Sequence, residues 1–105
     1  MEQALAREAA MNMEKLPPET IAVIETVLPL EERYAPDWGL IGALLDNEVD
    51  RLHETGDEKY VNYLPYHFLE DWDIRRKDEV YGESQRKKVR EFLKSLASGG
   101  ERTAQ

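Results

Sequence analysis

Apolar residues recur every three or four positions along most of this chain, and that spacing restricts the folds open to it. The clearest stripe lies between Trp38 and Glu54. Its apolar members are Ile41, Leu44, Leu45, Val49 and Leu52. Residues with this spacing share one face of an α-helix. Asp37 precedes the stripe as a suitable N-cap, and Gly56 follows it as a C-terminal stop. The segment is therefore predicted to be a helix with one buried face.

The region before this helix contains two further apolar segments bounded by prolines. Residues 2–16 are rich in good helix formers and are predicted to form a helix, which Pro17 and Pro18 end. Residues 18–28 are short and rich in β-branched side chains, so a strand is the alternative there. The flanking prolines favour a helix. Residues 29–36 are expected to form a connection.

A second helical pattern follows Gly56 and contains a proline. Apolar and aromatic residues are spaced by three and four from Tyr60 to Trp72. Pro65 lies inside this pattern, where it removes a backbone donor and clashes with the preceding turn. We expect it to kink the helix near Val61 or to split the helix in two.

The C-terminal region contains one more helical pattern. The polar residues 74–82 are expected to form a loop, after which Ser84 is a suitable N-cap. The last helix is predicted at 85–97, and Gly99-Gly100 should end it. Residues 98–105 are then expected to be a flexible tail.

No segment of the sequence shows the alternating pattern of a strand. The prediction is therefore an all-α fold, a compact bundle of four to five helices with a Pro-kinked helix around residue 65. Residues 1–97 are predicted to form a single helical domain, which is an ordinary size for one domain.

Composition narrows the classes of function. The chain has 105 residues and no cysteine, which excludes disulfides, thiolate zinc sites and cysteine nucleophiles. Its net charge of −8 opposes direct nucleic-acid binding and favours encounter with a basic protein, although plain solubility is an alternative explanation. No apolar run is long enough for a membrane span, and Met1–Ala4 do not begin a signal peptide, so a cytoplasmic location is expected.

Carboxylates are concentrated on the predicted helix at 38–54. Asp46, Asp50 and Glu54 are four residues apart and stack on one side, where like charges repel. They are predicted to dock a basic partner. The alternative is an ordinary solvated face, compensated by neighbouring basic residues. Glu48 projects into the apolar arc instead, which is costly unless it pairs with an arginine, lies at the rim of the core or acts as a functional acid.

An aromatic cluster borders this helix in sequence. Five aromatic residues face different directions around a helix and cannot all lie in one core: Tyr60, Tyr63, Tyr66, Phe68 and Trp72. Tyrosine and tryptophan are favoured at protein interfaces, which makes these residues candidates for partner binding. The alternative is a core position with the hydroxyl groups reaching water.

Two histidines offer a different chemistry. His67 and Asp71 are four residues apart, and His53 adds a second imidazole. Together with Glu48 they suggest a small metal-binding or enzymatic domain. No spacing among them matches a known metal motif, so the prediction remains no catalytic, cofactor or metal site.

Basic residues gather towards the C-terminus. They are Arg75, Arg76, Lys77, Arg86, Lys87, Lys88, Arg90 and Lys94. A solvated helix face is the simplest interpretation. A nucleic-acid patch works against the net charge, and association of acidic and basic faces in a homo-oligomer is a further option.

Two segments resemble a group of small bacterial proteins. Tyr60–Leu69 contains the triplet Tyr63-Leu64-Pro65, and Glu83–Leu93 contains Gln85 and ends in Phe-Leu. The order of an aromatic Tyr-Leu-Pro helix, a polar loop and a Gln-containing helix resembles several small, uncharacterised bacterial all-helical proteins, some of which look like neighbours of toxin systems. The resemblance covers the C-terminal half and implies an all-helical fold, a bacterial origin and no particular activity.

Together these features predict a non-catalytic protein-binding domain. Its most concrete form is an immunity- or antitoxin-type inhibitor of a basic partner. An acidic nucleic-acid mimic that inhibits a DNA-binding machine is the first alternative, and the metal-binding or enzymatic domain is the second.

Overall fold

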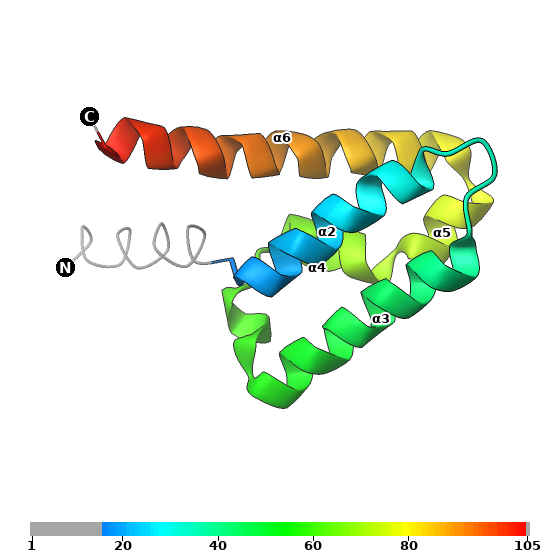
Figure 1. Ribbon diagram of the computed structural model, residues 1–105, viewed down its shortest axis with the longest axis horizontal. Helices are drawn as coiled ribbons and strands as arrows, with labels where there is room; N and C mark the ends of the chain where they lie inside the picture. Colours follow the sequence, from blue (N-terminus) through cyan, green and yellow to red (C-terminus); the bar gives the residue numbers. More distant parts are fainter. Residues whose placement is uncertain (1–15, 105) are drawn as a thin grey trace.

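Five α-helices and one turn of 3-10 helix make up the regular structure of residues 16–104, the part of the chain that this computed structural model describes (Figure 1). In chain order they are α2 (Pro18–Glu31), α3 (Trp38–Thr55), η1 (Asp57–Tyr60), α4 (Tyr63–Glu70), α5 (Trp72–Lys77) and α6 (Glu79–Ala104). The all-α prediction is confirmed. The helix predicted at 2–16 falls almost wholly outside the described residues.

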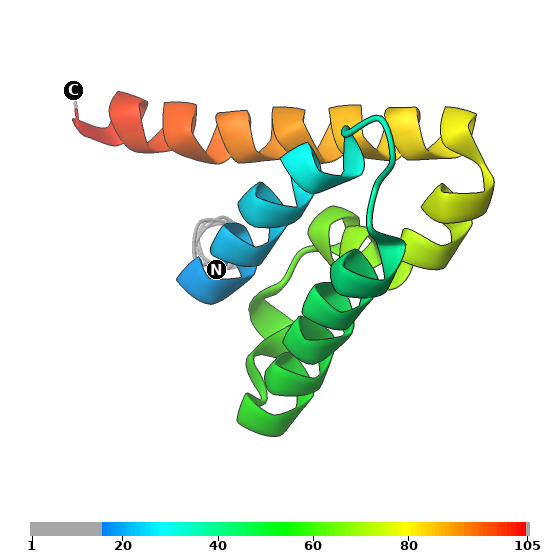
Figure 2. The same cartoon turned by 45° about the vertical axis from the view of Figure 1, so that its right-hand side comes forward.

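Helices α2 and α3 run side by side in opposite directions, and α6 crosses at one end of this pair (Figures 1 and 2). The short helices α4 and α5 lie between α3 and α6 and contact both. The core is where these elements meet. Its fully buried apolar residues are Ile24, Val27, Leu28, Ile41, Leu45, Leu52, Phe68, Leu69 and Val89.

Helix α3 forms where its stripe and caps predict it. The Asp37 carboxylate accepts a hydrogen bond from the backbone N–H of Leu40 at 3.1 Å, which satisfies one free donor of the first turn. Gly56 ends the helix with a φ of +75°, a left-handed conformation that favours glycine. Both positions confirm the sequence prediction.

The proline in the aromatic region splits the helical pattern instead of bending one helix. The chain is extended at Val61 and Asn62, between η1 and α4. The Asn62 side chain accepts from the backbone N–H of Tyr63 at 2.7 Å. Pro65 is the third residue of α4, where a backbone N–H has no partner within the helix. The break therefore lies three residues before the proline.

Two predictions on the C-terminal region are wrong. Residues 74–82 are not a loop, because α5 extends to Lys77 and α6 begins at Glu79. Ser84 lies inside α6 and is not its cap. Asp78 takes that role, since its carboxylate accepts from the backbone N–H of Tyr81 at 3.0 Å.

The ends of two helices also differ from prediction. Helix α2 continues through Pro29 to Glu31, three residues beyond the expected end at Leu28. Helix α6 continues past Gly99-Gly100 to Ala104. Glycine lowers helix stability without ending a helix that other residues support.

Candidate functional site

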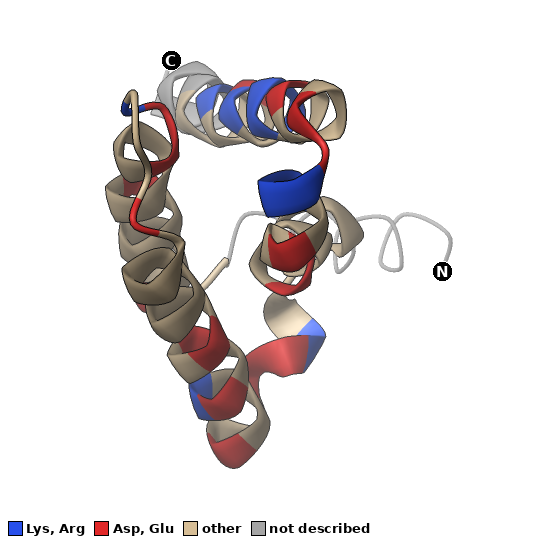
Figure 3. Cartoon of the chain, turned by 90° about the vertical axis from the view of Figure 1, so that its right-hand side faces the viewer, with Lys and Arg blue, Asp and Glu red and all other residues tan. Residues whose placement is uncertain are grey.

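Asp46, Asp50 and Glu54 form an acidic stripe along α3, and all three are exposed. Four residues of α-helix rise about 6 Å, so the stripe spans about two turns. Asp46 accepts a hydrogen bond from the Trp72 indole nitrogen at 3.0 Å. Within residues 16–97, no member of the stripe forms an ion pair with Lys, Arg or His. Figure 3 shows acidic residues along the C-terminal half of α3, which is the lower part of that helix in the view, and basic residues on α5 and α6.

Trp72 joins α5 to the acidic stripe. Its ring lies against Gly42 of α3, where a Cβ atom would stand only 2.7 Å from ring carbons. The absent side chain at Gly42 therefore lets the two helices approach. The indole ring is half-buried and its N–H reaches Asp46, so this predicted site residue holds a neighbouring helix beside the stripe.

Tyr66 adds a second link to the end of α3. Its hydroxyl group forms a hydrogen bond with Nε2 of His53 at 3.0 Å. Burial raises the pKa of Tyr66, and the nearby carboxylates of Glu70 and Glu58 raise it further. Nδ1 of His53 also contacts the Glu58 carboxylate. Both contacts lie at the C-terminal end of the acidic stripe.

The two remaining tyrosines lie differently. Tyr60 is half-buried in η1, with the ammonium group of Lys59 5.2 Å from its ring centroid. Tyr63 is 76% exposed and lies on the side of α4 that faces α6. Its ring packs on His67 with centroids 4.1 Å apart. The structure thus brings Trp72 and Tyr66 to the acidic stripe, whereas Tyr63 belongs to another surface.

Glu48 has structural partners. It is 4% exposed and accepts from the Thr20 hydroxyl at 2.6 Å and from Nε and Nη2 of Arg51 at 2.9 and 2.7 Å. Burial raises the pKa of Glu48, but the hydrogen bonds from Arg51 and Thr20 together with the Arg51 charge outweigh that effect and lower it overall. Glu48 is therefore an ionised, fully bonded carboxylate at neutral pH.

His67 and Asp71 lie on the side of α4 that faces α6. They are separate from Glu48 and its two partners, Thr20 and Arg51. The His67 Nδ1 atom is 3.8 Å from Oδ2 of Asp71. Asp71 accepts from the Tyr81 hydroxyl at 2.7 Å and from Gln85 at 3.1 Å, and its hydrogen bond raises the pKa of Tyr81. In the described range, no three His, Cys, Asp or Glu residues are grouped to hold a metal ion.

Sequence reasoning missed a buried ion network at the end of α2. Arg75 is 2% exposed and donates through Nε and Nη2 to Glu31 at 2.9 and 2.8 Å. It also donates to the Phe68 carbonyl and to Gln85, both at 2.6 Å, and its guanidinium lies 3.8 Å from the Phe68 ring centroid. The interpretation of the basic residues as a solvated face is therefore wrong for Arg75.

Arg86 is buried as well and joins the same network. Its Nη1 donates to Glu31 at 2.9 Å. One signal in the sequence pointed to this position: the apolar stripe of the last helix, extended back by one turn from Val89, falls on Gln85 and Arg86. Beside it Arg90 forms a two-pronged ion pair with Glu32, and the Arg90 hydrogen bond lowers the pKa of Glu32.

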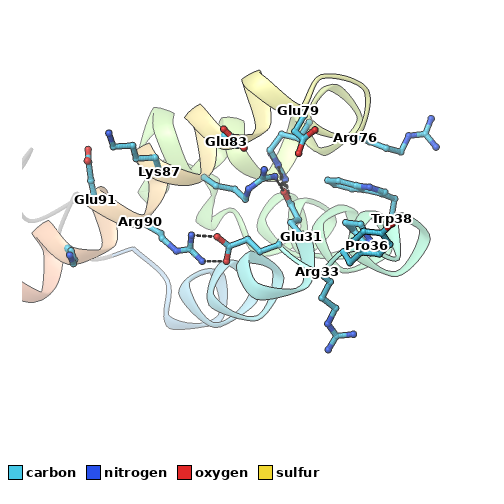
Figure 4. Close-up of a pocket in the computed structure, with 15 residues that line it drawn as sticks. Glu31, Arg33, Pro36, Trp38, Arg76, Glu79, Glu83, Lys87, Arg90 and Glu91 are labelled. Carbon is cyan, nitrogen blue, oxygen red and sulfur yellow. Dashed lines mark hydrogen bonds and ion pairs between the residues drawn. The ribbon is translucent and has the colours of Figure 1, made fainter.

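A groove of about 720 Å³ opens above this network, between the connection that links α2 to α3 and the first half of α6 (Figure 4). Trp38 and Pro36 line one end of it. The charged residues that line it are Glu31, Glu32, Arg33, Arg75, Arg76, Glu79, Glu83, Arg86, Lys87, Arg90, Glu91 and Lys94.

Comparison with known proteins gives no relationship: no family model, no curated protein and no solved structure matches this chain. Among the described helices, none has the length and apolar character that a membrane span requires.

Proposed function

We propose that this chain is a non-catalytic protein-binding domain whose acidic stripe docks a basic partner protein. The single observation that carries the proposal is the unpaired state of Asp46, Asp50 and Glu54 among the residues the structure describes. Like charges at this spacing are unfavourable by a few tenths of a kcal/mol per pair, so a basic partner would relieve a cost that the fold leaves in place.

The contrast with other carboxylates supports this assignment. Glu31, Glu32 and Glu48 each pair with arginines of the same chain. The alternative explanation is that neighbouring basic residues compensate the charge of the stripe. In the described structure, no basic residue forms such a pair with it. Trp72 and Tyr66 flank the stripe with half-buried aromatic surface, which is the residue type enriched where partners bind tightly.

The most concrete form of this function is an inhibitor of a basic enzyme, as in immunity or antitoxin pairs, acting in the cytoplasm. Electrostatic attraction to the stripe would speed association, and the aromatic residues would set the dissociation rate. Mimicry of nucleic acid has less support, because the acidic stripe is confined to α3, whereas basic residues lie on α5 and α6 (Figure 3).

Affinity capture from the native host tests the proposal. The bait is the full chain, and the stripe variant carries Asp46→Asn, Asp50→Asn and Glu54→Gln. Asparagine at 46 retains an oxygen that accepts from the Trp72 indole, so the fold should be unaffected. We expect a basic protein that is captured by the wild type and lost with the stripe variant.

A matched control separates the stripe from net charge. The control variant carries Glu25→Gln, Glu83→Gln and Glu91→Gln, three exposed acids on α2 and α6. Both variants change the formal charge from −8 by +3, to −5. Capture that depends on the stripe survives in the control variant. Equal loss in both variants, or equal capture by all three baits, would refute the role of the stripe.

A further inference from the structure

Two buried arginines share one carboxylate at the floor of the α2–α6 groove. Arg75 and Arg86 both donate to Glu31, whose side chain is fully buried. The other acid at this end of α2, Glu32, is already paired with Arg90. The group formed by Glu31, Arg75 and Arg86 therefore carries one positive charge in excess. A buried charge without a counter-charge is unfavourable, and an anion in the groove would offset it.

Arg86 has hydrogen-bond capacity left for such an anion. It is 9% exposed, and Nη1 is its one nitrogen with a hydrogen-bond acceptor in the described structure. No fully buried side-chain nitrogen or oxygen in that part of the chain lacks a partner. The Nε and Nη2 atoms of Arg86 must therefore reach solvent, and the groove is the open space that borders this residue.

The size and the lining of the groove suit a short segment of peptide. Its volume of about 720 Å³ is within the range of pockets that enclose a ligand of a few hundred daltons. Figure 4 shows Trp38 and Pro36 at one end and Arg90 towards the other, with Glu31 between them. Trp38 is half-buried, and Tyr34, which also lines the groove, is fully exposed. The groove thus combines a cationic floor with an aromatic end.

The remaining charges favour a single carboxylate over a more highly charged ligand. Glu79, Glu83 and Glu91 line the same groove and form no ion pair with residues 16–97. They would repel a phosphate dianion or a nucleic-acid strand more strongly than a monoanion. We propose that the groove binds a short peptide segment of a partner protein, with one carboxylate held by Arg86 and an adjacent apolar side chain on Trp38.

Two small peptides test this site by NMR on the 15N-labelled full chain. The probes are acetyl-Gly-Glu-Leu-amide and its counterpart with Gln in place of Glu. Inorganic phosphate at the same concentration is the third arm. At millimolar concentration the Glu peptide should shift the Nε–H signal of Arg86 and the indole N–H signal of Trp38. The Gln peptide should bind at least about tenfold more weakly, because it lacks a charge-assisted hydrogen bond.

Two substitutions locate the response. Arg86→Met should weaken binding of the Glu peptide by about tenfold or more, whereas Lys87→Met, which removes an exposed cation from the same groove, should change it by less than about threefold. Equal responses to the two peptides, shifts that spare Arg86 and Trp38, or phosphate binding as tight as that of the Glu peptide would overturn the proposal. If Arg86→Met does not fold, the comparison of the two peptides on the wild type decides.

Discussion

Neutralising Glu31 should destabilise the domain far more than neutralising its neighbour Glu32. Both carboxylates pair with arginines of α6, but the Glu31 side chain is 0% exposed and the Glu32 side chain is 43% exposed. In Glu31→Gln, Arg75 and Arg86 remain buried without a counter-charge, which costs about 3–5 kcal/mol. In Glu32→Gln, water screens the exposed Arg90, so the loss should be below about 1 kcal/mol.

Urea unfolding followed by circular dichroism at 222 nm measures both values. With an m-value of about 1.5 kcal/mol/M, the unfolding midpoint should fall by about 2–3 M for Glu31→Gln and by less than about 0.7 M for Glu32→Gln. Similar midpoints for the two variants would refute the conclusion that Glu31 is the anion of a buried network.

A double-mutant cycle on the folded variants checks the same network. Removing Arg86 together with the Glu31 charge eliminates one of the two unpaired buried cations. The double variant Glu31→Gln, Arg86→Met should therefore lose less free energy of unfolding than the two single variants lose in total. Strict additivity of the three free energies of unfolding would mean that these side chains do not interact.

Three further predictions follow from the geometry. Gly42→Ala places a Cβ against the Trp72 ring and should cost about 1–3 kcal/mol in urea unfolding; no loss would contradict the packing of that ring. Gly56→Ala forces a left-handed conformation and should cost about 1–2 kcal/mol, whereas Gly39→Ala, on the exposed first turn of α3, should not destabilise the domain. The pKa of Glu48 is lowered in the folded state, so its charge stabilises the fold above the ordinary value of 4.5 and that contribution is lost as pH falls through the folded value. The free energy of unfolding should therefore differ most between wild type and Glu48→Gln near neutral pH and least in acid below the folded pKa of Glu48; a difference independent of pH would contradict the assignment.

The sequence predicted best the features that depend on adjacent residues. The bounds of α3 follow from Asp37 and Gly56, whose capping roles act within a few positions of the helix. The apolar stripe of α3 also predicted the buried face of this helix correctly. Three of its residues, Ile41, Leu45 and Leu52, are fully buried. Local signals suffice where the helix ends are set by their own caps.

The missed start of α6 has a local cause and a tertiary one. Asp78 and Ser84 are both suitable caps, and the polar residues between them favoured the later one. Gly82 added to that error, since glycine usually marks a loop. In the fold Gly82 is buried within α6, where a Cβ would approach the Arg86 guanidinium to 3.0 Å. Close packing, and not chain flexibility, explains this glycine.

The buried arginine network depends on residues that are distant in sequence. Glu31 lies 44 positions from Arg75 and 55 from Arg86. No local spacing connects them, so each arginine matched the pattern of an exposed helix face. The same limit applies to the contact of Trp72 with Asp46, 26 positions apart, which joins the aromatic region to the acidic stripe.

The association rate with the captured basic partner, measured at low and at physiological salt, tests directly whether the acidic stripe drives binding. For the wild type and the control variant, the rate should fall steeply as salt rises, because exposed charges are screened beyond about 8–10 Å. For the stripe variant, the rate at low salt should be at least about tenfold lower and nearly independent of salt. Equal rates and equal salt dependence in the wild type and the stripe variant would contradict the proposed function.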